Sequence, residues 1–440
     1  MRITTQQSRI PWSWAVIALM PWFAISVRDA ITNTGMAFTL RKFFDDPALI
    51  GLVLSTNYAF SLTVGSLVAF ISDYIWTPLG RRRPFLIVSF LGAAILSIFL
   101  PLSTVGWLTI VLIVLYQFVS DFAGSYEPFT MDIIPPDQRG RSGSITHWYK
   151  SGAGALAMAF LIGHFDAEYS LFGMSFSGEH AMYWINACIL GAAGFIILFL
   201  IREEKPENID RPPLGKLLTQ RFIVEITKPT ILRLMGLALS IQTLWQGMYQ
   251  FEPFLITEQW GYEKTEYGYL LTASMIFTVL LVPIAGYISD RFDRMKLLRI
   301  GLYGVVITKI FFYTYFEFFV SGRPPITAVL GIGLLKSTVG SFMAVACVPL
   351  IFDYVPRKRL GTLGCAMGLA FATSSFINTN VMGLWIKFSS QKLFNLPEGE
   401  YNYFAAYHWI ILTGILGIFY IHYFAWSERK GKITRLSDEG

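Results

Sequence analysis

The sequence predicts an all-α membrane protein with twelve transmembrane helices in two six-helix bundles. Hydrophobic residues make up 54% of the 440 residues and charged residues only 15%, whereas soluble domains carry roughly 25% charged residues. The apolar residues gather in stretches of about 20, which is the length that crosses a bilayer as a helix. A charged signature that follows the second stretch returns half a chain later, which indicates two similar bundles.

Twelve apolar stretches can be placed along the chain. They cover residues 12–38, 50–72, 84–101, 107–130, 142–165, 183–201, 231–255, 266–288, 298–320, 327–351, 362–387 and 405–426. The first lacks a small-residue cleavage pattern, so we interpret it as a retained helix and not as a signal peptide. With both termini in the cytoplasm of a cell (inner) membrane, most of the 35 lysines and arginines lie on that side. The net charge of +6 therefore orients the chain and does not indicate a nucleic-acid partner.

A polar segment at 202–230 divides the chain. It is predicted to be a cytoplasmic linker between an N-terminal bundle, 1–201, and a C-terminal bundle with a short tail, 231–440. The outer loops are short except for 166–182 and 389–404, which leaves no soluble domain for catalysis. Three cysteines inside predicted spans offer no disulfide framework, and no metal-ligand or nucleophile motif is present. We therefore expect no enzyme activity, no cofactor and no metal.

The charged signature occupies a short cytoplasmic loop in each half. Its charged members are Asp73, Arg81, Arg82 and Arg83 in the first half, and Asp290, Arg291 and Arg294 in the second. A companion motif contains Asp132 and Arg139, and it recurs at Asp353 and Arg359. A carboxylate beside arginines can form a latch that favours one closed state. The alternative is that these charges only anchor the helix ends and fix the topology.

Over its whole length the chain resembles the major facilitator superfamily. The loop from Ser72 to Phe85, with its Asp, its Gly seven residues later and its Arg-Arg-Arg-Pro-Phe ending, is similar to that of sucrose transporters and glycoside-pentoside-hexuronide cation symporters. The resemblance implies that the charged loops gate the cytoplasmic mouth and that helices 1, 4, 7 and 10 line a cavity. The positions that hold paired carboxylates in sodium-using melibiose symporters are Ser61 and Gly65 here, so we expect no sodium site there.

Charged residues inside the spans are the candidate functional groups. Each costs at least ~2.5 kcal/mol in a bilayer, so it tends to face a partner or a wet cavity. Arg28 and Asp29 are adjacent in the first span, and Asn33 shares the face of Asp29. The pair resembles the basic-acidic pair of melibiose-type symporters, in which the acid binds sugar hydroxyls. A structural ion pair is the alternative.

The fourth, fifth and tenth spans supply further charges. Asp121 in the fourth span matches the functional acid that the family places in this helix, while Glu127 lies on a different face. Lys150 resembles the basic residue of the fifth helix that pairs with these acids. Lys336 in the tenth span is a charge from the other bundle that could meet Asp29 or Asp121.

The seventh span carries a ligand-like stripe. Its members, at the spacing of one helix face, are Gln242, Trp245, Gln246, Tyr249 and Glu252. Aromatic rings pack against the C–H faces of a sugar, while amides and carboxylates bond its hydroxyls. The alternative is an inner face that is hydrogen-bonded to neighbouring helices.

Together these features predict a monomeric carrier of a small polar solute, a sugar or glycoside, that works by alternating access with protons as the coupling ion. The groups expected to couple protons are Arg28, Asp29, Asp121, Glu127 and Glu252, because a buried carboxylate beside a cation can titrate. The groups expected to bind the solute are Asp29, Asn33, Asp121, Lys150, Gln242, Trp245, Gln246, Tyr249 and Lys336. A carrier of an amino acid, peptide or organic anion, and a transporter-like nutrient sensor, remain alternatives.

Overall fold

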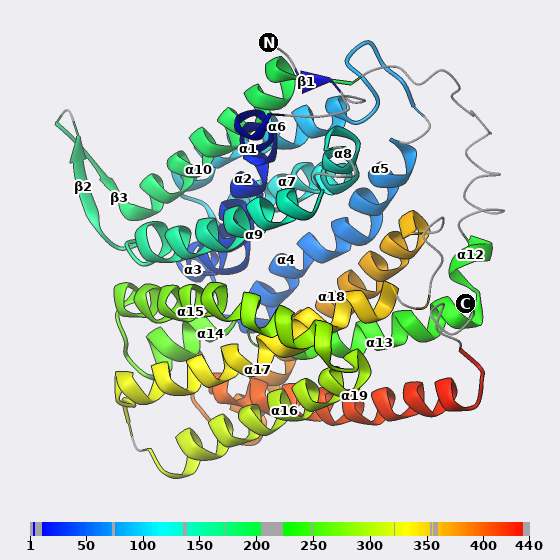
Figure 1. Cartoon of the computed structure of the whole chain (residues 1–440). Helices are drawn as coiled ribbons and strands as arrows, with labels where there is room; N and C mark the ends of the chain where they lie inside the picture. Colours follow the sequence, from blue (N-terminus) through cyan, green and yellow to red (C-terminus); the bar gives the residue numbers. More distant parts are fainter. Residues whose placement is uncertain are drawn as a thin grey trace. The chain divides into compact units, whose positions relative to one another are not determined.

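The computed structural model describes residues 3–4, 11–72, 75–134, 139–171, 173–203, 223–246, 248, 250–320, 322–352, 354 and 360–433. They form two compact units, Met1–Arg211 with Glu263–Thr272, and Pro212–Tyr262 with Ala273–Gly440. Helices account for nearly all the elements in both units (Figure 1). The predicted all-α class is therefore confirmed.

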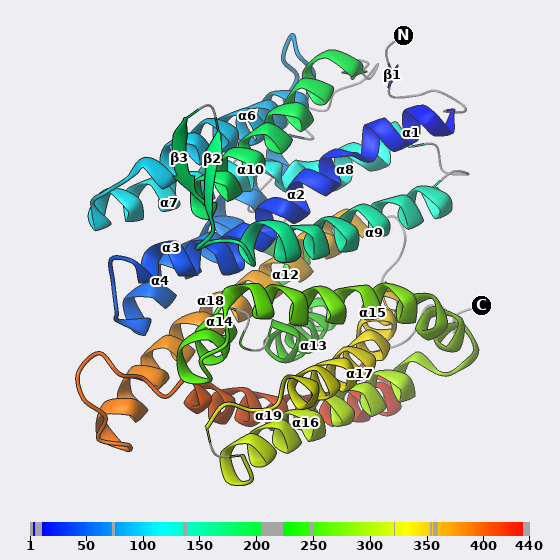
Figure 2. The ribbon, with the colours of Figure 1, turned by 90° about the vertical axis from the view of Figure 1, so that its left-hand side faces the viewer.

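The first unit is built from helices that are repeatedly interrupted by short π-helical or 3₁₀-helical turns, labelled η. In order they are α1 (Trp12–Leu19), α2 (Pro21–Ala30), η1 (Ile31–Gly35), α3 (Met36–Arg41), α4 (Pro47–Phe60), η2 (Ser61–Gly65), α5 (Ser66–Ile71), α6 (Arg83–Phe99), η3 (Leu100–Leu102), α7 (Gly106–Ser120), η4 (Asp121–Ser125), α8 (Tyr126–Ile133), α9 (Arg139–Leu156), η6 (Ala157–Ile162), α10 (Gly178–Phe195) and η7 (Ile196–Leu200). Within this unit α6 and α10 lie side by side (Figures 1 and 2).

Two small sheets accompany these helices. Strand β1 (Ile3–Thr4) pairs in parallel with β4 (Ile201–Arg202), which directly follows η7. Strands β2 (Glu168–Leu171) and β3 (Met174–Ser177) form an antiparallel hairpin next to α10 (Figure 2). The segment 166–182, expected to be a plain loop, is therefore partly a hairpin.

The second unit has longer uninterrupted helices. They are α12 (Val224–Ile226), α13 (Pro229–Gln246), α14 (Glu252–Phe254), η9 (Leu255–Gln259), α15 (Lys264–Arg291), α16 (Arg294–Phe318), α17 (Ile326–Phe352), α18 (Leu360–Lys392), η11 (Tyr403–Ala405) and α19 (Ala406–Arg429), the start of α15 being grouped with the first unit. Helix α16 packs against both α17 and α19 (Figure 2). Around Trp260, Phe312 and Phe404 the contacts are aromatic, with ring centroids 5.6 to 6.2 Å apart.

Eight helices of the described residues are long and apolar enough to cross a membrane. They correspond to the predicted spans 1, 2, 3, 4, 6, 8, 10 and 12. Helices α16 and α18 correspond to the predicted spans 9 and 11, while span 5 is divided between α9 and η6 and span 7 between α13, α14 and η9. α16, for example, carries Arg299 and Lys309 within its length.

Candidate functional site

Three interrupted helices bring the polar residues of the first unit together. The π-helical turns η1 and η2 interrupt the first and second predicted spans, and the 3₁₀ turn η4 interrupts the fourth. The interruption at η4 has a covalent cause, because Pro128 has no N–H for the carbonyl of Gly124 four residues earlier. Irregular turns inside helices are frequent at functional sites.

Arg28 joins the first and fourth helical segments. Its Nη2 lies 2.8 Å from Asp29 Oδ1, while its Nη1 donates to the backbone carbonyl of Ser120 at 3.0 Å. The Arg28 side chain is 15% exposed and that of Asp29 is 52% exposed, so the carboxylate faces an accessible side. Arg28 therefore contacts both its neighbour Asp29 and the fourth helical segment.

Asn33 belongs to the same polar group. Its amide nitrogen donates to the carbonyl of Asp29 at 2.8 Å, and its amide oxygen accepts from the hydroxyl of Tyr58 at 3.1 Å. Tyr58, on α4, was not among the predicted site residues. Tyr58 lies in a mostly apolar stretch of the sequence, so nothing there predicted that its hydroxyl would reach the first helix.

Asp121 opens η4 and faces η2. Its Oδ1 accepts from Ser61 Oγ at 2.7 Å. Its Oδ2 and the Nε2 of Gln117, one turn earlier, are buried polar atoms without a hydrogen-bond partner among the described residues. One orphan acceptor and one orphan donor on the same face suit a hydroxyl or water, which can satisfy both.

The two turns pack with their backbones in contact. A Cβ added to Gly124 would lie 2.6 Å from the carbonyl oxygen of Gly65, and a Cβ added to Gly65 would lie 3.4 Å from the carbonyl oxygen of Asp121. Small residues allow such an approach between membrane helices. Gly65 has no carboxylate that could bind sodium, and its role in this structure is to let η2 pack closely against Asp121.

Lys150 lies near the acids of this unit but does not form an ion pair with them within the described structure. Its Nζ sits 3.6 Å from the ring centroid of Trp22, a cation–π contact. Glu127 and Asp29 are the acidic groups whose charges act on it. Lys150, on α9, thus contacts the ring of Trp22, on α2, and the predicted pairing of Lys150 with an acid is not seen among the described residues.

The predicted stripe of the seventh span is wrong beyond Gln246. Helix α13 ends at Gln246 and a new helix, α14, begins at Glu252. Pro253 explains the break, because it has no N–H to donate to the preceding turn and therefore interrupts a helix that reaches it. In the first turn of a helix no such donor is needed, so Pro253 fits the start of α14. Tyr249 and the side chain of Trp245 lie outside the described residues.

The two glutamines of α13 bond to hydroxyls of α18. Gln242 Nε2 lies 3.1 Å from Ser375 Oγ, and Gln246 Nε2 lies 3.2 Å from Thr379 Oγ1. Thr379 in turn donates to Gln250 at 2.6 Å. This geometry is the hydrogen-bonded inner face that was the alternative reading of the stripe.

Lys336 and Glu252 form an ion pair within the second unit. Lys336 Nζ, on α17, lies 3.1 Å from Glu252 Oε1, and the two side chains are 40% and 17% exposed. The interruption of the seventh helix places Glu252 where it meets α17. Interrupted helices are a common way to build ion and substrate sites in transporters.

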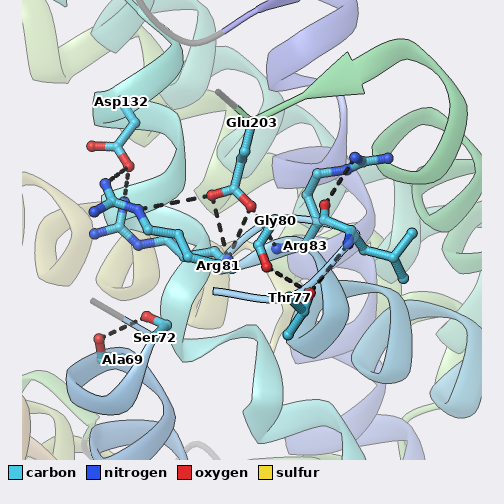
Figure 3. Close-up of polar contacts among 10 residues, drawn as sticks. Ala69, Ser72, Thr77, Gly80, Arg81, Arg83, Asp132 and Glu203 are labelled. Atoms are coloured by element: carbon cyan, nitrogen blue, oxygen red, sulfur yellow. Dashed lines mark hydrogen bonds and ion pairs between the residues drawn. The ribbon is translucent and has the colours of Figure 1, made fainter. Parts of the chain in front are cut away.

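The arginines of the first charged loop are all engaged within their own unit (Figure 3). Arg81 and Arg82 both donate to Asp132 Oδ2 at the end of α8, so the two repeated motifs of this half contact each other. Arg83 donates to the carbonyls of Ile197 and Leu198 at 3.1 and 2.6 Å. These contacts bind the loop to α8 and η7.

Glu203 completes this loop and was missed by the sequence analysis. Its buried carboxylate accepts from the backbone N–H groups of Arg82 and Arg83 at 3.0 and 3.2 Å, and Arg81 Nε lies 3.9 Å away (Figure 3). Gly80, with φ of +117°, turns the loop so closely that an added Cβ would collide with Glu203. The partners of Glu203 are mostly backbone groups about 120 residues away, and sequence patterns do not show these.

Other members of the predicted gating set are only partly described. Asp73 lies outside the described residues, and so does the side chain of Asp290. The Arg291 guanidinium stacks 4.2 Å from the Tyr287 ring centroid, on an exposed surface. Asp293 caps α16 by accepting from the N–H of Lys296 at 2.8 Å, one residue before Arg294.

We expect Glu203→Leu to lower the free energy of unfolding by about 1–3 kcal/mol, because two backbone N–H groups lose their acceptor. Burial is the main cause that raises the pKa of Glu203 above its ordinary value of 4.5. The stabilisation from protonated Glu203 is therefore complete below pH 4.5 and is lost as the pH rises through the raised pKa. Thermal unfolding in detergent at several pH values measures both effects.

Glu203→Gln separates the charge from the contacts. The amide cannot ionise, so its Tm should gain on that of the wild type as the pH rises above 4.5. Glu398→Gln, at an exposed glutamate, is the matched control and should follow the wild type. If Tm changes with pH in the same way for the wild type, Glu203→Gln and Glu398→Gln, the raised pKa of Glu203 is contradicted.

The comparisons with known proteins agree with this architecture. The family model described as Major Facilitator Superfamily matches residues 14–255 and 234–432. The crystal structure of the nucleoside transporter NupG is similar with a TM-score of 0.70 and 12% identity over 92% of this chain and 98% of that chain. A D-xylose-proton symporter is similar with a TM-score of 0.69 and 14% identity over 93% and 97%. No match was found among curated protein sequences.

A bacterial homologue of the human lysosomal transporter Spinster, in an inward-facing and occupied conformation, is also similar. Its TM-score is 0.70 at 14% identity, over 96% of this chain and 99% of that chain. At these identities the likeness of the solved structures concerns the fold.

Proposed function

Because the chain belongs to the Major Facilitator Superfamily, we propose that it is a secondary active transporter that moves a sugar or glycoside by alternating access, in symport with protons. It is an integral, multi-pass membrane protein. The solute and the proton are its proposed partners besides lipid. A monomer in the cell (inner) membrane with both termini in the cytoplasm is part of the proposal, as are the bundles 1–201 and 231–440 and the linker 202–230.

The observation that carries the proposal is the polar group around η1, η2 and η4. It combines an accessible carboxylate on Asp29 with the amide of Asn33 and the orphan polar atoms of Gln117 and Asp121. Hydroxyl groups both donate and accept, so a polyhydroxylated solute matches a surface that offers both kinds of atom. The similarity to a D-xylose-proton symporter is consistent with such a solute.

The proposed roles follow the two units. We assign solute contact to Asp29, Asn33, Asp121, Lys150, Gln242, Trp245, Gln246, Tyr249 and Lys336, and proton coupling to Arg28, Asp29, Asp121, Glu127 and Glu252. We assign gating to Asp73, Arg81, Arg82, Arg83, Asp290, Arg291 and Arg294. The ion pairs of Arg81 and Arg82 with Asp132 support the gating role, because they hold the charged loop against α8 and would have to break for the loop to move.

Transport by the purified protein in proteoliposomes tests the proposal. With an interior one pH unit more alkaline, we expect a sugar to accumulate up to about tenfold for one proton per solute, since each unit is worth about 1.4 kcal/mol. A sodium gradient without a pH gradient should give no accumulation. The panel includes pentoses, hexoses, glycosides and nucleosides, because the similarity also extends to a nucleoside transporter. Accumulation that follows sodium alone would contradict proton symport.

A further inference from the structure

Two lysines and one carboxylate meet inside the second unit. Lys336 on α17 is paired with Glu252 at 3.1 Å. Lys309 on α16 is only 4% exposed, and Glu252 and Lys336 are the charged groups that act on it. Glu252 is thus ion-paired with Lys336, and the buried Lys309 is near enough to both for their charges to act on it.

The packing of α16 on α17 explains why the two lysines are close. The two helices are antiparallel and touch at two glycines of α16. A Cβ added to Gly301 would lie 3.1 Å from the backbone of Met343, and a Cβ added to Gly304 would lie 2.5 Å from the side chain of Val339. Five residues further along α16, Lys309 stands within about one helical turn of the level of Lys336. The two helices lie side by side in both views (Figures 1 and 2).

The charge of Lys309 is not balanced by an acid of its own. Within the described part of the chain, no hydrogen-bond or ion-pair partner is found for its Nζ. Glu317, also on α16, acts instead on Tyr313 and His408. Because an unpaired cation at bilayer depth is unfavourable, an anion that approaches both lysines would be bound strongly.

The surroundings leave one side open and the other closed. Lys336 is 40% exposed, so a ligand can reach the pair from its side. One turn after Lys309 on α16, Phe312 stacks on Tyr407 with ring centroids 5.0 Å apart, and Tyr407 is 3% exposed.

We propose that Lys309 and Lys336 form an anion subsite in the second unit, and that the transported solute carries a carboxylate. This inference rests on the proposed transport function and names its substrate class, a hydroxylated acid in preference to a neutral sugar. The ligand carboxylate accepts hydrogen bonds from both ammonium groups, and Glu252 competes with it for Lys336. Glu252 thereby holds Lys336 in place when the solute is absent.

Matched pairs of sugars test the subsite directly. D-glucose and D-glucuronate, or D-galactose and D-galacturonate, differ only in a hydroxymethyl group against a carboxylate. We expect the purified wild-type protein to bind the acid of each pair at least about tenfold more tightly, measured by thermal stabilisation and by proteoliposome uptake. Lys309→Met should weaken the acid by about 10- to 100-fold and leave the neutral sugar within about twofold.

Two further variants complete the design. Lys309→Arg keeps the charge and should keep the preference for the acid, while Lys296→Met, at an exposed lysine of the same helix, should behave like the wild type. If Lys309→Met fails to fold, the comparison of acid with neutral sugar in the wild type still decides. Wild-type protein that binds and transports the neutral member but ignores the acid overturns the subsite and leaves the sugar carrier intact. Wild-type protein that takes up no member of the panel overturns the proposed function as well.

Discussion

Asp121→Asn is expected to abolish uphill transport while downhill exchange continues. Under a gradient of one pH unit the accumulation ratio should fall from about tenfold to about one. The Asn oxygen still accepts the hydrogen bond from Ser61, which the Asp121 carboxylate now receives at 2.7 Å. The amide cannot take up or release a proton, so the solute gradient is no longer tied to the proton gradient. Concentrative uptake and counterflow in the same proteoliposomes measure the two activities separately.

Asp45→Asn is the matched control for this substitution. Asp45 is an acid of the same unit that pairs with Arg41 at 2.9 Å, and its side chain is 76% exposed. Exposed ion pairs contribute little to stability, so the control should accumulate solute like the wild type. If the Asp121→Asn protein accumulates solute normally, Asp121 is not the proton site, and Asp29 and Glu252 are the next acids to substitute.

Gly124→Ala should destabilise the first unit by about 1–3 kcal/mol, a large effect for one methyl group. The new Cβ would lie 2.6 Å from the carbonyl oxygen and 3.0 Å from the Cα of Gly65. Both are backbone atoms of η2, so no side chain can turn away to make room. Thermal unfolding of the purified protein in detergent gives the loss, and it should be accompanied by weaker solute binding.

Gly152→Ala provides the comparison within the same unit. Gly152 lies inside α9, and an added Cβ would have nothing within 4 Å. Alanine there should be neutral or stabilise the helix by roughly 0.5–1 kcal/mol. Equal unfolding midpoints for the two alanine variants would show that η2 and η4 separate easily, contrary to the packing described above.

The features that the sequence predicted well depend on local chemistry. Apolar stretches of bilayer length are fixed by composition, and helices follow them closely except in the seventh span, where α13 ends at Gln246. The contact of Arg28 with Asp29 follows from their adjacency in the chain. The charged loop was identified as a unit, although its arginines were not matched to Asp132.

What escaped prediction depends on irregular backbone and on distant partners. The stripe drawn at helical spacing on the seventh span fails where Pro253 belongs to a new helix, and the helix of the fourth span changes to the 3₁₀ turn η4 at Asp121. The role of Glu203 could not be predicted, because it accepts hydrogen bonds from backbone N–H groups, and nearly every residue has one. Hydroxyls such as those of Tyr58 and Ser61 became relevant only when helices packed against each other.

The short parallel ladder between β1 and β4 has a consequence for engineering. Ile3 pairs with Ile201 and Thr4 with Arg202, so the chain enters and leaves the first six predicted spans at the same place. Ends that meet in this way would suit circular permutation of a separate fragment that holds only the first six predicted spans. A peptide of a few residues could join them, and new termini could open at Gly173 in the exposed turn between β2 and β3.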